Sequence, residues 1–465
     1  MGNYFGTDGF RGEANVTLTA DHAYRLGRIL GRYCREHDLS RPAEETVPPH
    51  RPRIAVGKDT RRSSYMLEYA LAAGLAASGA EACMLHVTTT PCVAFVTAKE
   101  DFDCGVMISA SHNPYTDNGI KLVNGKGEKI DDATIREIEL YLDGRLSELG
   151  IEGSDIPFAR GEDLGQIVDY SAGRNRYIGY LISLSRYSFR NFRVGLDCAN
   201  GSAWMIAKSV FDALGAKTYT INANPDGLNI NRNAGSTHIE VLQDYVRENG
   251  LDVGFAFDGD ADRCIAVDEN GDVVNGDHIL YVLSQHLRKS GDLVQNTVVT
   301  TIMSNLGLYR ALDEAGIRYE QTTVGDRYVY ENMQQNGYCI GGEQSGHIIL
   351  SKYATTGDGI LTAIKIMEAV ISAKLPLSKL AEPVKMLPQM MKNIRVADKK
   401  AVRDNAAVQA ALQSVKERLG DSGRILLRES GTEPVVRVMV ESLTEEMCES
   451  YAQEVVDVIL KEGLA

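Results

Sequence analysis

The segment Ile54-Ala-Val-Gly-Lys-Asp59 is a short apolar run that ends in polar residues, which is typical of a buried strand. A helical pattern follows it, with a predicted N-cap at Ser63 or Ser64 and a stop at Gly79. Further apolar runs follow after Gly79 and at Cys104–Ser109. This part of the chain therefore predicts the order strand, helix, strand, strand.

The same order recurs twice further along the chain. The second and third units open with Val194–Ala199 and Val298–Ile302, and they close with Val253–Phe257 and Tyr338–Gly341. Internal repetition of strands that alternate with helices predicts three similar α/β domains with mixed, mostly parallel sheets.

A polar loop follows the closing strand of each unit. The three loops are Ser109-Ala-Ser-His-Asn-Pro114, Asp258-Gly-Asp-Ala-Asp-Arg263 and Gly342-Glu-Gln-Ser-Gly-His347. Open α/β sheets bind ligands at the carboxyl ends of their strands. We therefore expect the three loops to face one shared cleft.

The last part of the chain has a different pattern. It reads as a strand at 393–396, a helix at about 399–419, strands at 424–427 and 435–440, and a helix from Thr444. This predicts a smaller α+β domain, reached through a linker or hinge marked by Pro376, Pro383 and Pro388. The predicted domains are 1–165, 166–268, 269–378 and 379–465.

Composition excludes several classes of protein. The chain has 465 residues and a net charge of −14, which argues against a nucleic-acid or membrane-surface binder. It contains no apolar stretch of the length that a transmembrane helix needs, and its start does not resemble a signal peptide. Its eight cysteines are scattered singly, as in the reduced, buried thiols of a cytoplasmic protein.

Asp258, Asp260 and Asp262 alternate over five residues. Carboxylates this close repel one another, and a divalent cation with oxygen ligands, such as Mg²⁺, removes that repulsion. Arg263 adds a cation beside the anion that such a site would bind. A solvated acidic turn is one alternative, and a calcium EF-hand loop is another, although Arg263 stands where that loop needs glycine.

Ser111 lies in a loop with His112, Asn113 and Pro114. A helix cap or turn is the simple interpretation of these residue types. A phosphorylated Ser111 would instead complete the coordination of a magnesium ion that the three aspartates hold. His112 then suits hydrogen bonding better than general base catalysis.

Three further segments carry candidate binding residues. Glu343, Ser345 and His347 suit sugar hydroxyls, with a glycine-rich bulge as the alternative. Arg428-Glu-Ser-Gly-Thr-Glu-Pro434 and Arg437 have the composition of a phosphate cradle, with a hairpin turn as the alternative. The segment Gly6-Thr-Asp-Gly-Phe-Arg-Gly12 is too glycine-rich for a predicted strand, and its Arg11 suits an anionic site. Lys121 is a candidate proton carrier.

These five motifs, in this order, resemble the α-D-phosphohexomutase superfamily. Gln344 and the Ser430-Gly-Thr-Glu-Pro-Val-Val-Arg437 form of the last loop resemble its bacterial branch that acts on glucosamine phosphates. The resemblance implies four domains around a central cleft and interconversion of glucosamine 6-phosphate and glucosamine 1-phosphate through a 1,6-bisphosphate, which feeds UDP-N-acetylglucosamine synthesis. A sibling enzyme for glucose or mannose phosphates and a catalytically silent phosphosugar-binding protein are the alternatives.

The resemblance also implies a role for each site residue. A phosphoserine at Ser111 would bind one Mg²⁺ with Asp258, Asp260 and Asp262, while Arg11, Lys121 and His347 surround the reacting phosphoryl group. Arg263, Glu343 and Ser345 would contact the substrate, and the non-reacting phosphate would be held by Arg428, Ser430, Gly431, Thr432 and Arg437. A hexose 1,6-bisphosphate would be the activator, the partner would be a small phosphosugar, and a homodimer is left open.

Two positions depart from the pattern of the superfamily. Ala261 stands where many relatives have glycine, which implies a strained metal loop if its φ is positive. Glu429 lies inside the phosphate loop, where its charge weakens the local positive potential.

Overall fold

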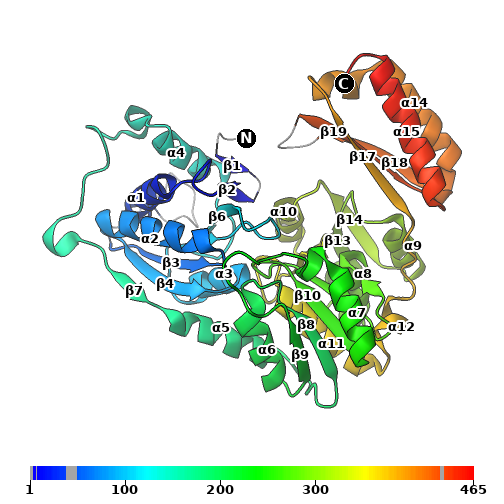
Figure 1. Ribbon diagram of the computed structural model, residues 1–465, viewed down its shortest axis with the longest axis horizontal. Coiled ribbons are helices and arrows are strands. Elements are labelled where there is room, and N and C mark those ends of the chain that lie inside the picture. The colour runs from blue at the N-terminus through cyan, green and yellow to red at the C-terminus, as the bar shows by residue number, and fades with distance from the viewer. Residues whose placement is uncertain (1–3, 7, 38–49, 430–433) are drawn as a thin grey trace. The chain divides into compact units, whose positions relative to one another are not determined.

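The computed structural model describes residues 4–6, 8–37, 50–429 and 434–465, and Figure 1 shows its elements. The chain forms two compact units. The first contains residues 1–302 and 319–381, and the second contains residues 303–318 and 382–465. Sheets and helices make up both units, and the sheets of the first unit combine parallel and antiparallel strands, which confirms the predicted α/β class. The four domain boundaries given above stay a prediction.

The first sheet has the strand order β1-β2-β6-β5-β3-β4-β7. Its inner strand β3 is parallel to β4 and β5, whereas β6 is antiparallel to β5 and β2. The strands are β1 (Phe5–Gly6), β2 (Gly9–Glu13), β3 (Arg53–Lys58), β4 (Glu81–Val87), β5 (Cys104–Ile108), β6 (Asp117–Asn124) and β7 (Ile167–Asp169). The helices in this part of the chain are α1 (Ala20–Glu36), α2 (Arg62–Ala77), α3 (Thr90–Lys99) and α4 (Asp132–Leu142).

Helices α1 and α2 pack closely because glycine lies where they meet. A side-chain carbon at Gly27 would lie 2.3 Å from the carbonyl oxygen of Leu71, and one at Gly74 would lie 2.1 Å from that of Tyr24. Larger residues at these two positions would separate the helices. Close packing of these helices on one another helps to hold the first sheet, which carries Arg11 on β2 and Ser111 in the loop after β5.

The second and third sheets follow the same plan. The second has the order β12-β11-β10-β8-β9 and the third has the order β14-β13-β15-β16. Their strands are β8 (Arg193–Asp197), β9 (Lys217–Ile221), β10 (Val253–Phe257), β11 (Cys264–Val267), β12 (Val273–Val274), β13 (Thr297–Thr301), β14 (Arg318–Thr322), β15 (Ile340–Gly342) and β16 (Ile348–Leu350). The helices here are α5 (Ser171–Ser183), α6 (Ala203–Ala213), α7 (Ile239–Asn249), α8 (Gly276–Ser290), α10 (Asp326–Asn336), α11 (Gly359–Ala373) and α12 (Leu377–Ala381).

The predicted repeat is confirmed. Each opening strand (β3, β8 or β13) is parallel to the closing strand of the same sequence repeat (β5, β10 or β15). The three polar loops begin directly after β5, β10 and β15, at the carboxyl ends of these strands. Local sequence patterns therefore located all three loops correctly.

Two local predictions were wrong. The segment Gly6–Gly12 is not free of strands, because β1 and β2 form a hairpin there. Glycine is needed in this hairpin: Gly9 has φ +90°, and a side-chain carbon on it would lie 2.5 Å from the carbonyl oxygen of Ile120 on β6. The start of α2 also differs, since the helix begins at Arg62 with Arg61 as its N-cap, while the Ser64 hydroxyl donates to Asp59 instead.

The second unit contains a three-stranded antiparallel sheet with the order β17-β19-β18. Its elements are α9 (Leu306–Glu314), β17 (Gln389–Arg395), α13 (Lys399–Asp404), α14 (Ala406–Leu419), β18 (Arg424–Glu429), β19 (Val435–Glu441) and α15 (Glu445–Lys461). The helix expected at 399–419 is interrupted by Asn405, whose side chain caps α14. Thr444 caps α15, at the predicted start of that helix.

Two further expectations concern the chain as a whole. Seven of the eight cysteines are buried, as their scattered positions suggested. Across the described residues, the structure has no helix that combines the length and the apolar character needed to cross a membrane.

Candidate active site

Asp258, Asp260 and Asp262 form a buried cluster in the loop after β10. One carboxylate oxygen from each lies within 4.8 Å of the others. The loop turns tightly, and the Ala261 amide donates to the carbonyl of Asp258 at 3.1 Å. Ala261 has φ +57°, so the left-handed conformation anticipated for this position is present without glycine.

Burial and mutual repulsion decide the charges in this cluster. Burial raises the pKa of Asp258 well above its usual range, and the neighbouring Asp262 and Asp260 add to this effect. For Asp262, burial acts in the same direction, but Lys121, His347 and Arg263 together outweigh it and hold the pKa well below its usual range. One oxygen each of Asp260 and Asp262 is buried without a hydrogen-bond partner in the described structure. Buried carboxylate oxygens without partners are the ligands that a hard divalent cation uses, so the residues fit such an ion.

Ser111 reaches this cluster from the loop after β5. Its hydroxyl oxygen lies 2.5 Å from Asp258 Oδ2 and donates a hydrogen bond to it, although 147 positions separate the two residues. Ser111 is buried and has φ +52°. Two of the three predicted loops therefore meet at a hydroxyl oxygen and a carboxylate.

Lys121, on β6, is the cation nearest to the aspartates among the described residues. Its Nζ lies 2.9 Å from Asp260 Oδ2, 3.1 Å from Asp262 Oδ2 and 3.6 Å from Asp8 Oδ2. Burial favours neutral lysine, but these carboxylates raise the pKa of Lys121 well above its usual value. In this arrangement Lys121 is a fixed cation within the acidic cluster.

Arg11 and Arg263 flank the serine loop. Arg11, on β2, donates from Nη1 to Asn113 Oδ1 at 3.2 Å and forms an ion pair with Asp8. Arg263 follows the aspartates, and its Nη1 lies 3.0 Å from His112 Nδ1. Burial, together with Arg263 and Arg11, lowers the pKa of His112 to about 4. His112 is therefore neutral near pH 7, in agreement with a hydrogen-bonding role rather than that of a general base.

The loop after β15 contributes a third group of side chains. His347 is buried, with Nδ1 3.8 Å from Asp262 Oδ1 and Nε2 3.5 Å from Asp326 Oδ2. The Gly357 amide donates to Nε2 at 3.0 Å, so this nitrogen carries the lone pair and the proton lies on Nδ1, facing Asp262. Glu343 accepts from the Gly325 amide at 3.0 Å, whereas Ser345 is exposed at the tip of the loop.

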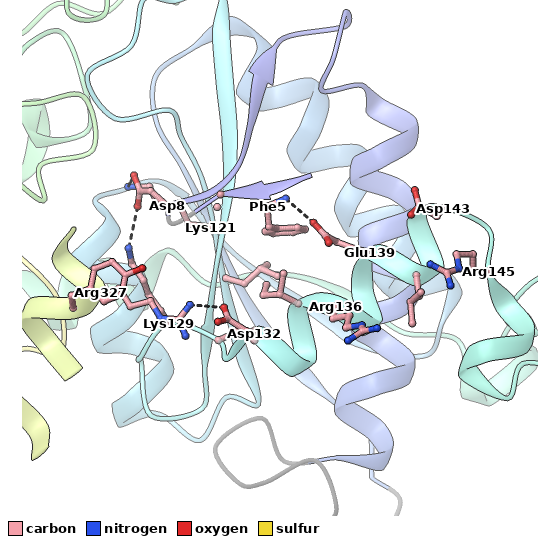
Figure 2. Close-up of a pocket in the computed structure, with 17 residues that line it drawn as sticks. Phe5, Asp8, Lys121, Lys129, Asp132, Arg136, Glu139, Asp143, Arg145 and Arg327 are labelled. Atoms are coloured by element: carbon pink, nitrogen blue, oxygen red, sulfur yellow. Dashed lines mark hydrogen bonds and ion pairs between the residues drawn. The ribbon is translucent and has the colours of Figure 1, made fainter. Parts of the chain in front are cut away.

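A cavity of about 620 Å³ adjoins the site, and Figure 2 shows the residues that line it. Asp8 and Lys121 line one side of it, and side chains of α4 such as Arg136 and Glu139 line the other. Lys121, which contacts the aspartate cluster, also lines this cavity and so connects the two. Its lining carries charges of both signs, which suits a polar ligand.

The predicted phosphate cradle belongs to the second unit. Ser430, Gly431 and Thr432 lie outside the described residues. Arg428 on β18 and Arg437 on β19 are directly opposite each other in the strand register. Glu429 lies 2.8 Å from Arg403 Nη1, so an arginine partly neutralises the acidic residue that departs from the pattern of the superfamily.

The sequence patterns missed several residues of the site. Asp8 and Asp326 pair with Lys129 and extend the charged network around Lys121 and His347. Asp59 and Arg61 bind the serine loop from the carboxyl end of β3. Their position directly after a strand was a signal of the kind that identified the other three loops.

The chain matches one family along most of its length. The descriptions are phosphoglucomutase/phosphomannomutase alpha/beta/alpha domain I for residues 2–146, domain II for 175–271, domain III for 275–387 and the C-terminal domain for 391–458. The segments that carry Ser111, the aspartates and Glu343 fall in domains I, II and III in turn.

Similar proteins include two bacterial phosphoglucosamine mutases. The one from Lachnospira eligens is 62% identical over 100% of both chains, and the one from Lachnoclostridium phytofermentans is 57% identical over 100% of this chain and 99% of its own. Among solved structures, a phosphoglucomutase/phosphomannomutase family protein from Burkholderia thailandensis has a TM-score of 0.77 at 22% identity, covering 99% of this chain and 98% of that one. An Aspergillus fumigatus N-acetylphosphoglucosamine mutase, solved in complex with GlcNAc-6P and magnesium, has a TM-score of 0.70 at 16% identity, covering 100% and 96%.

Proposed function

We infer the reaction from one premise: the chain belongs to the phosphoglucomutase/phosphomannomutase family, in its bacterial phosphoglucosamine mutase branch. It is a mutase, and its reaction interconverts glucosamine 6-phosphate and glucosamine 1-phosphate. The full-length identity to relatives of that name favours this substrate over glucose or mannose phosphates.

We propose that Ser111 carries the phosphoryl group. The observation that supports this role is the hydrogen bond from its hydroxyl to Asp258 in the acidic cluster. The donor set suits Mg²⁺, bound by Asp258, Asp260 and Asp262 together with an oxygen of phosphorylated Ser111. When bound, the ion supplies positive charge that offsets the charge of the transferring phosphoryl group. The magnesium described for the Aspergillus enzyme agrees with this choice of ion.

The chain's own residues position the group and neutralise its charge. Transfer moves the phosphoryl group from Ser111 Oγ to the free hydroxyl of the sugar, which gives a 1,6-bisphosphate. The sugar hydroxyl gives up its proton in this step and Ser111 Oγ takes one up, so the Ser111 hydroxyl again donates to Asp258, as it does in the structure. The bisphosphate then reorients within the site, and its other phosphoryl group is transferred to Ser111. Arg11, Lys121 and His347 surround the reacting group in this scheme, which depends on positioning and charge rather than on a strong base.

The remaining roles concern substrate binding. We assign Glu343 and Ser345 to sugar hydroxyls and Arg263 to the substrate, because Glu343 and Arg263 flank the aspartate cluster and its partner His347. The non-reacting phosphate is assigned to Arg428, Ser430, Gly431, Thr432 and Arg437. A hexose 1,6-bisphosphate serves as activator by phosphorylating Ser111. With seven of the eight cysteines buried, we place the reaction in the cytoplasm.

An assay with glucosamine 6-phosphate, Mg²⁺ and a trace of glucose 1,6-bisphosphate tests the proposal. Ser111→Ala should lose the activity by at least about 1,000-fold while keeping its melting temperature, because the nucleophile is removed. Ser183→Ala, at an exposed position on α5, is the matched control and should remain fully active. Intact mass should show a gain of about 80 Da in the wild type that is lost in Ser111→Ala. A Ser111→Ala enzyme with near-normal turnover would refute the phosphoserine scheme.

A further inference from the structure

Ser111 has a backbone conformation that L-residues other than asparagine and aspartate rarely adopt. Its φ is +52°, in the left-handed region. A non-glycine residue stays there only when its surroundings hold it in place, and such residues cluster at active sites. The conformation also sets the direction of the Ser111 side chain, because the Cα–Cβ bond turns with the backbone. Whatever fixes this peptide therefore aims the hydroxyl at Asp258.

Arg61 holds the carbonyl side of the serine loop. Its side chain is fully buried, and Nη2 donates to the carbonyls of Ser111 and Asn113, both at 2.9 Å. Nη1 donates to the carbonyls of Pro114 and Asp117, and Nε pairs with Asp59 Oδ2 at 2.7 Å. All five N–H groups of the guanidinium are thus engaged, and four of them bind main-chain carbonyls between positions 111 and 117.

Asn231 binds the same two carbonyls from another part of the chain. It lies between β9 and α7, and its Nδ2 donates to Ser111 O at 2.8 Å and to Asn113 O at 3.0 Å. The main-chain amide of Asn231 donates to the Ala199 carbonyl at 2.9 Å, which fixes the position of Asn231. Each of these two carbonyls therefore accepts two hydrogen bonds, one from Arg61 and one from Asn231.

Asp59 and Ser109 hold the amide side of the nucleophile. The Ser111 amide donates to Ser109 Oγ at 3.0 Å, and that hydroxyl donates to Asp59 Oδ2 at 2.7 Å. Asp59 also receives the Arg61 amide and the Ser64 hydroxyl on its other oxygen. One buried carboxylate thus links the network on the amide side to the guanidinium on the carbonyl side.

We propose that Asp59, Arg61, Ser109 and Asn231 are positioning residues that hold Ser111 in the left-handed conformation from which its hydroxyl reaches the aspartate cluster. None of them binds the cluster's carboxylates in the contacts described above, so they act through the Ser111 peptide. The inference rests on the proposed function, since it concerns the group that Ser111 transfers. A purely structural role would stabilise the loop without changing the rate of each folded molecule.

Asn231→Ala tests the proposal with Asn222→Ala as its control. Both asparagines have positive φ, and Asn222 uses its amide to bind Asp197 instead, at 3.0 Å. The two variants thus carry similar backbone strain. Because a shift of about 1 Å in a reacting atom lowers rates by roughly 100-fold, we expect Asn231→Ala to lose about 10- to 100-fold in kcat. Its KM should change less than about threefold, and its melting temperature should match that of Asn222→Ala.

Ser109→Ala keeps the proposal testable if Asn231→Ala does not fold. It removes the acceptor of the Ser111 amide together with the hydrogen bond from that hydroxyl to Asp59, and the same fall in kcat with little change in KM is expected. Arg61→Lys should also lose activity, because the single ammonium group of lysine cannot bind the four carbonyls that the guanidinium binds. The proposal is wrong if both the Asn231 and Ser109 variants keep the kcat of Asn222→Ala, or if Arg61→Lys is fully active. An inactive Ser111→Ala enzyme beside fully active positioning variants would overturn this inference alone, whereas an active Ser111→Ala enzyme would overturn the proposed function.

Discussion

Replacing Lys121 by methionine tests how the acidic cluster is kept together. The ammonium group lies 2.9 Å from Asp260 and 3.1 Å from Asp262, and its side chain is only 8% exposed. In the absence of a metal ion, Lys121 and Arg263 offset the repulsion among the carboxylates. Methionine preserves most of the volume of the side chain and removes the charge, so the variant separates electrostatics from packing.

The expected loss of stability follows from the geometry. At about 3 Å and an effective dielectric constant of about 20, each contact represents about 5 kcal/mol of attraction before desolvation is counted. Removing one partner of a buried pair reduces stability by about 3–5 kcal/mol in measured cases, because the remaining charge stays buried. We therefore expect the melting temperature of Lys121→Met in EDTA to fall by roughly 5–15 °C.

Magnesium should reverse much of this loss. An ion that binds only the folded state at 100 times its dissociation constant adds about 2.7 kcal/mol to stability. The gain should be larger in Lys121→Met than in the wild type, where Lys121 already neutralises part of the cluster. Calorimetry or fluorescence-monitored unfolding, with and without Mg²⁺, measures both effects.

Lys365→Met is the matched control. Lys365 is equally buried and lies 2.8 Å from Glu368, so its loss should also destabilise the chain. Because Lys365 and Glu368 are not part of an acidic cluster, Mg²⁺ should not change the melting temperature of this variant. The reasoning is refuted if Lys121→Met melts in EDTA at the wild-type temperature, or if Mg²⁺ stabilises Lys365→Met as much as Lys121→Met.

Three further predictions follow from individual residues. Burial raises the pKa of Asp358 to about 6, so its carboxyl in the folded protein keeps a proton that the unfolded chain releases near pH 4. The free energy of unfolding should therefore fall by about 3 kcal/mol as pH rises from about 4 to about 6. Urea unfolding should show this fall in the wild type and not in Asp358→Asn. Glu343→Gln should lower kcat/KM for glucosamine 6-phosphate by about 10- to 100-fold through weaker hydrogen bonds to sugar hydroxyls, and an unchanged ratio would contradict its assignment. Ala261→Val should lower stability by more than about 2 kcal/mol, because a β-branched residue tolerates φ +57° poorly, while Ala261→Gly should keep the response to Mg²⁺ in the same thermal assay.

The elements of the fold were largely predictable from the sequence, because each buried strand and its helix have a local pattern. The opening and closing strands of all three units occur within one or two residues of their predicted positions. The N-terminal hairpin escaped prediction because its glycine is required by a contact with a residue distant in sequence. Gly9 packs on the carbonyl of Ile120, which lies on the neighbouring strand β6. The break at Asn405 escaped prediction because no glycine or proline marks it; the Asn405 side chain instead caps α14 there.

The active site was predictable in part, for a different reason. Loops after the closing strands were expected to meet, and the hydrogen bond between Ser111 and Asp258 bears this out for two of them. The partners of each side chain were not predictable, because pairing depends on register and on loop conformation. Lys121 is an example: the sequence made it a candidate site residue, but its contacts with two aspartates 139 and 141 positions away do not follow from the sequence.

Two of the residues that position Ser111 lie at a site that the repeat itself predicts, the carboxyl end of the opening strand. Asp59 and Arg61 follow the opening strand β3, whereas Ser111 follows the closing strand β5, and these two strands are parallel neighbours in the sheet. Parallel pairing brings their carboxyl ends together, so a residue after one strand is placed to bind the main chain after the other. In the second unit, Asp197 ends the opening strand β8 and accepts from the amides of Ala199 and Gly235, which keeps its carboxylate within the loops next to the aspartates. The carboxyl end of the opening strand thus carries a buried aspartate that organises a loop in both repeats, although Asp59 lies just after β3 and Asp197 is the last residue of β8.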